Sequence, residues 1–134
     1  MRSLGSIVLA LMLSCTASYA AKKFPLTAAS TVPAARGTAE VGKDRNGNTE
    51  VTLKVEHLAT PESLSPPRAS YIVWLQEKGT DPENQGQLRV NHKLQGSFRT
   101  VTPRKSFDLF ITGEQDPTVK ARTGPEVLRA TIQP

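Results

Sequence analysis

The chain has 134 residues and a formal net charge of +5, with 22% charged and 37% hydrophobic residues. A chain of this length forms one domain rather than two. Ten prolines and nine glycines argue against long helices, and a single cysteine excludes an internal disulfide.

Residues 1–20 have the pattern of an export signal. Arg2 provides a positive start, residues 4–13 form a mostly apolar run, and Ala20 with the serine two positions before it offers the small side chains that signal peptidase reads. The run is shorter than the roughly 20 apolar residues that a membrane-spanning helix needs. We therefore expect a signal peptide, cleavage between Ala20 and Ala21, a periplasmic or extracellular location, and no transmembrane span.

Cys15 leaves a second route of processing open. Residues 12–15 loosely resemble a bacterial lipobox, in which the cysteine is lipidated and becomes the mature N-terminus. The protein would then be an outer-membrane lipoprotein, and we expect membrane association only in that case. Cleavage between Ala20 and Ala21 instead leaves a chain without cysteine, which forms no disulfide even in an oxidising compartment.

Residues 21–36 are rich in Ala, Thr and Pro and show no steady periodicity. Pro25 and Pro33 argue against a helix, so we expect an extended lead-in that serves as a tether or contains a first edge strand around residues 24–26. The folded domain is then expected over residues 37–134.

A β-hairpin is the first regular element expected in that domain. Residues 38–43 lead into a polar turn, and residues 49–58 return. The Asn-Gly pair in the turn tolerates the positive φ angles of tight hairpins. In the returning segment Val51, Leu53 and Val55 alternate with polar residues, which is the period of a strand with one wet face.

Further strands are expected toward the C-terminus. The run 71–75 follows a proline-rich loop and is apolar on both faces, which is typical of a central strand. After a polar turn that ends before residue 87, shorter strands are predicted at 87–90 and 98–101, followed by 106–112 and 127–132. Odd-numbered positions of the segment 106–112 are apolar and should face the core, whereas even-numbered positions face the other way.

Six to eight short strands joined by turns predict an immunoglobulin-like antiparallel β-sandwich. Its expected core consists of Val51, Leu53, Val55, Tyr71, Val73, Trp74, Leu75, Leu88, Val90, Phe107, Leu109, Ile111, Leu128 and Ile132. Trp74 is assigned to the core rather than to a sugar-stacking surface because it lies within an apolar strand.

The sequence contains no recognisable catalytic or metal-binding motif. His57 and His92 have no His or Cys neighbours, which leaves open only a site of two histidines and a carboxylate. No serine after residue 20 lies in a Gly-x-Ser-x-Gly elbow, and the segment from Asp44 lacks the glutamate that completes a calcium loop. Glu114 and Asp116 lie in a segment typical of a turn. We therefore predict a protein that is not an enzyme and binds no cofactor or metal.

A small basic group surrounds the predicted turn at residues 102–103. Arg99, Arg104 and Lys105 would form a positive patch suited to an anionic partner if their strands are neighbours, and the alternative is ordinary solvated charge. Nucleic acid is a poor candidate for an exported chain. The expected partner is an unknown envelope protein or an anionic glycan or lipid surface.

Three segments of the C-terminal half occur in an order that is also found in a known family. They are Ser70–Gln76 (SYIVWLQ) with the later Gly86-Gln87-Leu88, Phe107–Glu114 (FDLFITGE), and Thr123-Gly124-Pro125 before Val127-Leu128. This series resembles the extracytoplasmic C-terminal domain of anti-sigma-K-type factors over about residues 70–130. The resemblance implies the β-sandwich fold and supplies no catalytic residues. An export signal stands where that family has a sigma-binding segment and a transmembrane helix.

The whole chain also resembles small exported proteins of Gram-negative bacteria without an assigned activity. We therefore predict an exported, non-catalytic β-sandwich that serves as a binding or structural module of the bacterial envelope. Recognition would use loops at one end of the sandwich or strand addition at an exposed edge. Two alternatives stay open: an envelope lipoprotein lipidated at Cys15, and an accessory sensor domain related to anti-sigma factor outer domains.

Overall fold

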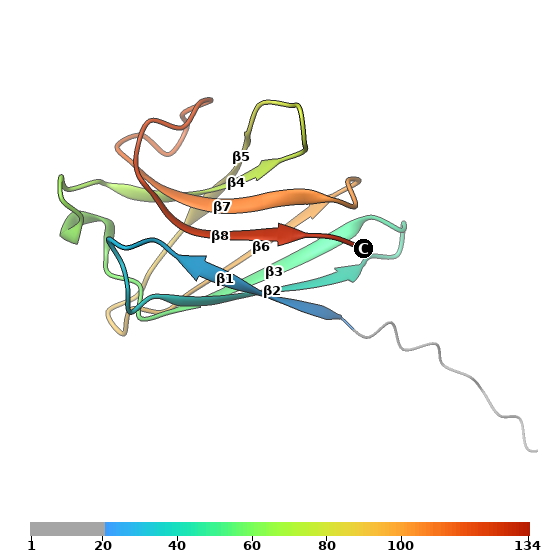
Figure 1. Cartoon of the computed structure of the whole chain (residues 1–134), viewed down its shortest axis with the longest axis horizontal. Coiled ribbons are helices and arrows are strands. Elements are labelled where there is room, and N and C mark those ends of the chain that lie inside the picture. Colours follow the sequence, from blue (N-terminus) through green and yellow to red (C-terminus); the bar gives the residue numbers. More distant parts are fainter. Residues whose placement is uncertain (1–20) are drawn as a thin grey trace, which may run out of the picture.

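A computed structural model describes residues 21–134, where the chain forms eight β-strands and one 3-10 turn (Figure 1). The elements are β1 (Lys22–Ala28), β2 (Arg36–Lys43), β3 (Thr49–Glu56), η1 (Pro61–Ser63), β4 (Ser70–Gln76), β5 (Glu83–Leu88), β6 (Gly96–Thr102), β7 (Phe107–Glu114) and β8 (Glu126–Ile132). All strand pairs are antiparallel. The predicted all-β fold is confirmed.

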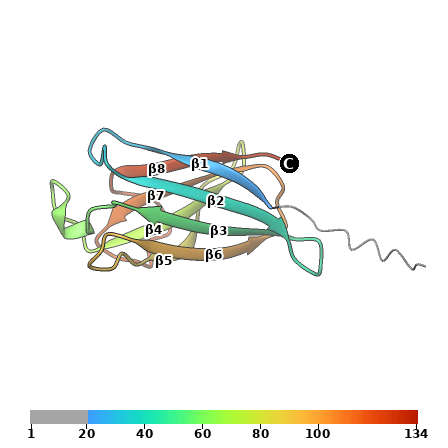
Figure 2. The same cartoon turned by 90° about the horizontal axis from the view of Figure 1, so that it is seen from below.

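The strands follow one another in a single sheet in the order β5-β4-β7-β8-β1-β2-β3-β6. The sheet folds over into two layers, one of β5, β4, β7 and β8 and one of β1, β2, β3 and β6 (Figure 1 and Figure 2). The order β8-β7-β4-β5 is that of strands G, F, C and C′ in an immunoglobulin domain, and β2-β3-β6 corresponds to A, B and E. The predicted immunoglobulin-like sandwich is therefore present.

The two end strands, β5 and β6, lie against each other and make the sandwich nearly barrel-like. The Thr100 hydroxyl on β6 donates a hydrogen bond to Gln85 Oε1 on β5 at 2.8 Å. Beside this contact the Phe98 ring covers Gly86, where an added Cβ would stand 3.2 Å from the ring. Side-chain contacts therefore close the seam between the two end strands.

The predicted hairpin is formed by β2 and β3. At its tip Asp44 Oδ1 accepts hydrogen bonds from the backbone N–H groups of Asn46 at 2.9 Å and Asn48 at 2.8 Å, and Gly47 takes a φ of +78°. This Asx turn explains the Asp-x-Asn-Gly-Asn sequence as turn chemistry.

The predicted central strand is β4, which pairs with β5 on one side and β7 on the other and is buried over residues 70–75. Of the expected core residues, all are buried except Val90, which packs partly buried against the same cluster. Trp74 is buried as expected, but it belongs to a second cluster, separate from the main core.

Most strand ends differ from the prediction by one or two residues, and the start of β5 differs by four. β5 begins at Glu83, whereas a polar turn was expected up to residue 86 and a strand from residue 87. Leu88 is the fully buried residue of this strand, and a bulge at Gln85 shifts its register against β4. Backbone pairing needs no apolar side chains, so an end strand made of polar residues carries no alternation signal.

Residues 21–36 contain β1, which lies within the sheet rather than at its edge. β1 pairs with β2 along residues 22–26 and with β8 at Thr27 and Ala28, and Leu26 is buried in the main core. The segment therefore joins the two layers of the sandwich.

Antiparallel pairing sorts the connections between the strands into two ends (Figure 2). The turn end carries the start of β1, the short β2–β3, β4–β5 and β6–β7 turns, and the end of β8. The loop end carries four connections, residues 29–35, 57–69, 89–95 and 115–125. Within residues 21–134 we find no helix of the length and apolarity that crossing a bilayer requires.

Candidate functional site

Arg104, the centre of the predicted basic group, is neutralised by two carboxylates. Its Nε donates to Glu77 Oε2 at 2.6 Å, and its terminal nitrogens donate to the two oxygens of Glu83 at 2.8 and 2.7 Å. The hydrogen bonds from this guanidinium hold the pKa of Glu83 below its ordinary value. The arrangement ties the β6–β7 turn to the β4–β5 turn, so Arg104 is not free to bind an external anion.

The other two residues of the predicted group are placed differently from each other. Arg99 on β6 forms an ion pair with Glu50 on β3 at 2.9 Å. Lys105 is exposed and makes no ion pair in the part of the chain that the structure describes. The structure thus leaves Lys105, of the three, as a cation available to an anion.

The remaining predicted site residues do not form a shared site. Cys15 and Ala20 lie outside the described residues, and Ala21 is exposed directly before β1. His57 follows β3 with a φ of +55°, and His92 lies in the exposed β5–β6 connection. Among the described residues no three His, Cys, Asp or Glu side chains converge to hold a metal ion.

A second apolar cluster lies away from the main core, beneath the β7–β8 loop. Ile72, Trp74 and Phe110 are fully buried in it, and the Trp74 and Phe110 rings stack with their centroids 6.4 Å apart. Val119 from the loop 115–125 packs against them. The β7–β8 loop therefore covers an apolar surface that its sheet would otherwise expose.

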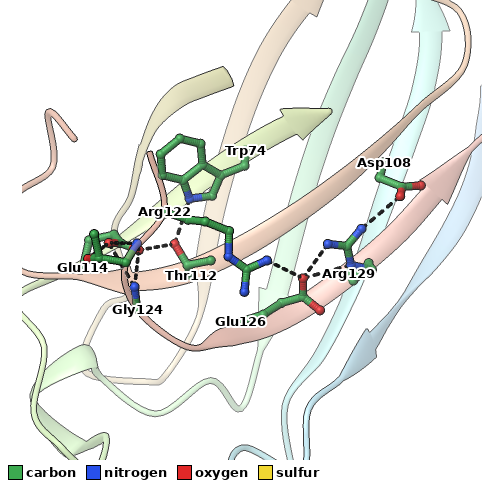
Figure 3. Close-up of polar contacts among 9 residues, drawn as sticks. Trp74, Asp108, Thr112, Glu114, Arg122, Gly124, Glu126 and Arg129 are labelled. Atoms are coloured by element: carbon green, nitrogen blue, oxygen red, sulfur yellow. Dashed lines mark hydrogen bonds and ion pairs between the residues drawn. The ribbon is translucent and has the colours of Figure 1, made fainter. Parts of the chain in front are cut away.

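Two arginines cover the Phe110 ring of the same cluster, and Figure 3 shows the ion pairs that they form with Glu126 and Asp108. The Cζ atoms of Arg122 and Arg129 lie 5.1 and 4.4 Å from the centroid of the Phe110 ring. Glu126 pairs with both arginines, at 3.4 and 2.7 Å, and Arg129 also pairs with Asp108 at 2.9 Å. Cation–π contacts and ion pairs thus hold these side chains over the ring.

Glu114, at the end of β7, is a fully buried carboxylate surrounded by hydrogen-bond donors (Figure 3). It accepts from the Thr112 hydroxyl at 2.7 Å, the Thr123 hydroxyl at 2.6 Å, the Thr123 N–H at 2.9 Å and the Gly124 N–H at 3.0 Å. Thr112 Oγ1 in turn accepts from Trp74 Nε1 at 2.7 Å. Burial by itself would raise the pKa of Glu114, but these hydrogen bonds outweigh burial and hold the pKa below its ordinary value.

The Glu114 network is the main feature that sequence reasoning missed. Glu114 and Asp116 look alike in the sequence, yet Asp116 is exposed and accepts hydrogen bonds only from the following turn, from the Thr118 N–H and hydroxyl at 2.8 and 2.7 Å. A strand that ends in Thr-x-Glu, with a Thr-Gly pair nine residues later, is the pattern that could have indicated the network. Its role is to attach the loop to the sheet.

The β7–β8 loop is held at further points. Asn84 Nδ2 on β5 donates to the carbonyl oxygens of Pro117 at 3.0 Å and Val119 at 2.8 Å. Gly124 approaches β7 so closely that an added Cβ would stand 1.5 Å from the Gly113 carbonyl oxygen. The loop is therefore anchored in its middle as well as at its C-terminal end.

Other connections at the loop end are also internally bonded. Asn91 Oδ1 accepts from the N–H groups of Lys93 at 2.9 Å and Gln95 at 3.0 Å, which repeats the Asx turn of the β2–β3 hairpin. The Tyr71 hydroxyl donates to the Ala59 carbonyl oxygen in the β3–β4 loop. Burial raises the pKa of this tyrosine to about 12.

The described surface has shallow grooves of mixed charge. One of about 300 Å³ lies at the loop end, between the η1 loop and β5, with Glu62 and Arg89 in its lining. Another of about 520 Å³ lies over β1, β2 and β3, with Lys23, Glu40 and Lys54 in its lining. In the second groove Lys23 forms an ion pair with Glu40 at 3.6 Å, so part of its charge is compensated by the protein itself.

Comparison with known proteins adds no relative: no family model, no curated protein and no solved structure matches this chain.

Proposed function

We propose that the protein is an exported, non-catalytic β-sandwich that acts as a binding or structural module of the bacterial envelope and uses the loop end for recognition. The observation that carries this proposal is that the two ends of the domain differ. The chain enters at the turn end, while the four longer connections gather at the opposite end (Figure 2). A module held by its N-terminus would present those loops outward.

The anchoring of the loops supports this assignment. The β7–β8 loop is fixed by Glu114 and Asn84, and the β5–β6 connection is closed by Asn91. Loops that are ordered before binding lose less conformational entropy when a partner docks. Functional residues are also commonly placed on loops that a rigid scaffold positions.

The chemistry of the buried carboxylate favours a structural role over catalysis. Glu114 has an altered pKa, which often marks an active site. However, it is closed off from solvent, and its donors come from the protein itself. It holds the recognition loop in place and is not positioned to touch a substrate.

Site-specific photocrosslinking tests the proposal. A photoreactive amino acid replaces His92 or Thr118 at the loop end, and in a matched control it replaces Asn46 in the β2–β3 turn; all three positions are exposed. Irradiation in intact cells should give partner adducts from the two loop-end positions and not from the control. Adducts from the β2–β3 turn alone would contradict the assignment of the recognition surface.

The lipoprotein alternative has one specific observation in its favour. Cys15 precedes the first residue of β1, Lys22, by seven positions, so a lipid on that cysteine would hold the turn end near the membrane. Palmitate labelling that is lost in Cys15→Ser would support it, and a mature N-terminus at Ala21 would exclude it. The accessory sensor alternative predicts that the loop end crosslinks to a component of an envelope signalling system.

A further inference from the structure

Four of the exposed cations at the turn end lie around the point where the chain enters the domain, and Lys78 in the β4–β5 turn is a further one. Lys22 begins β1, Lys43 and Arg45 lie at and just after the end of β2, and Lys105 lies in the β6–β7 turn. None of them makes an ion pair within residues 21–134. We call these four residues the entry cations.

Strand pairing brings the entry cations to the same end from three separate chain segments (Figure 2). Lys22 pairs with β2 two positions before Lys43, and Lys43 pairs with Thr49 at the start of β3. The Thr49 hydroxyl donates at 2.7 Å to the carbonyl oxygen of Arg104, the residue before Lys105. Strand pairing and this hydrogen bond therefore fix the backbone of the group, and its side chains are exposed.

The acidic side chains of this end are largely engaged by the protein itself. Asp44 accepts hydrogen bonds from its own turn, and Glu77 and Glu83 are held by Arg104. A fourth, Asp81, shares its turn with a lysine. The entry cations are thus left facing outward without a carboxylate bound to them.

The chain that precedes the described residues meets the domain at this end. If the chain is cut after Ala20, the new α-amino group of Ala21 adds a positive charge next to Lys22. If it is lipidated at Cys15, the seven residues up to Lys22 span at most about 25 Å. In the first form the entry cations gain a charge, and in the second they are held close to a bilayer.

We propose that the entry cations dock the domain, turn end first, on an anionic phospholipid bilayer, even in a chain that is not lipidated at Cys15. Exposed lysines and arginines are attracted to the negative surface potential of such a membrane. The group is spread over three chain segments, which suits many mobile headgroups better than one defined glycan. The inference rests on the proposed export, and it directs the loop end away from the membrane, where a partner can reach it.

Vesicle flotation of the chain that starts at Ala21 tests the docking. We expect binding to vesicles that contain phosphatidylglycerol, little binding to phosphatidylcholine alone, and loss of binding at raised ionic strength. Each neutralised cation should weaken partition about fivefold. The triple variant Lys43→Gln, Arg45→Gln, Lys105→Gln should therefore bind on the order of a hundredfold less tightly.

A matched control removes three cations from the loop end. Arg89→Gln, Lys93→Gln and Lys120→Gln change the net charge by the same amount, and all three side chains are exposed. This control should lose far less binding than the turn-end triple variant. If the two triple variants lost the same amount of vesicle binding, net charge alone would explain the attraction, and the proposed docking geometry would be wrong.

A second readout leaves the charges of the entry cations unchanged. The chain from Ala21 has no cysteine, so Asn46→Cys in the β2–β3 turn and His92→Cys at the loop end can each carry a polarity-sensitive dye. Vesicles should shift the emission of the dye on residue 46 and not that on residue 92. A shift at residue 92 alone, or binding to soluble anionic glycan but not to vesicles, would overturn the proposal, whereas the crosslinks at the loop end would be unaffected.

Discussion

Glu114→Gln is the substitution that most directly tests how the β7–β8 loop is held. In the native protein Glu114 Oε2 accepts from the Thr112 hydroxyl at 2.7 Å and the Gly124 N–H at 3.0 Å. The substitution removes the charge and places an amide nitrogen at one of the two oxygen positions. If the amide nitrogen takes the Oε2 position, the buried Thr112 hydroxyl and Gly124 N–H face another donor and lose their acceptor.

The magnitude follows from the number of unpaired donors. A buried donor without an acceptor costs about 1–3 kcal/mol, so Glu114→Gln should lower the free energy of unfolding by about 3 kcal/mol. For a domain of this size, that corresponds to a fall in Tm of roughly 12 °C. Trp74, the only tryptophan of the chain, is bonded to the same network and reports unfolding through its fluorescence.

The pH dependence supplies an independent check. The pKa of Glu114 is below its ordinary value in the folded protein, so the ionised carboxylate stabilises the fold fully above the unfolded-state pKa of about 4.3. That stabilisation is lost as the pH falls through the folded-state pKa. The stability gap between the native protein and Glu114→Gln should therefore narrow in acid.

Glu126→Gln is the matched control, because Glu126 is a half-buried carboxylate engaged in ion pairs with Arg122 and Arg129. Such a pair near the surface contributes less than about 1 kcal/mol. The reasoning about the buried network is refuted if Glu114→Gln unfolds no earlier than Glu126→Gln, or if its stability gap to the native protein is the same at neutral and acidic pH.

Three further predictions concern other parts of the sandwich. In the chain from Ala21, Tyr71 is the only tyrosine, so its absorbance should titrate with a midpoint near 12 in the folded protein and about 10 in denaturant. The free energy of unfolding should fall as the pH rises through this range. A midpoint near 10 in the folded protein would contradict the burial of Tyr71. Gly124→Ala should prevent stable folding because its Cβ meets the backbone, whereas Gly42→Ala, with open space around its Cβ, should melt like the native protein. Arg104→Gln should lower Tm slightly at low ionic strength and not at high ionic strength, because its ion pairs are exposed; an effect independent of salt would contradict that interpretation.

Local patterns predicted the parts of the fold whose side chains alternate with the strand period. The β2–β3 hairpin follows from its Asn-Gly turn and the alternation at Val51, Leu53 and Val55, and the inward residues of β7 follow from the same rule. The first four residues of β5 were assigned to a turn because they are polar or glycine and their order comes from pairing with β4.

The candidate site was less accessible to sequence reasoning because its contacts join distant residues. The sequence predicted Arg104 to be a free cation, but the fold brings Glu77 and Glu83 into contact with it although they are 27 and 21 residues away in the sequence. The sequence placed Glu114 in a turn, but Thr123, nine residues later, donates a hydrogen bond to its carboxylate. The spacing of residues along the sequence does not predict which distant residues become partners of a charged side chain.

The all-β class, the positions of most strands and the identity of most of the core are properties of the amino-acid sequence alone, because the period of apolar side chains decides which face of a strand is buried. The closure of the sheet through β1, the burial of Trp74 outside the main core, and the division into a turn end and a loop end were decided by tertiary structure. Each depends on which strands become neighbours, and that choice brings together residues that no local pattern connects.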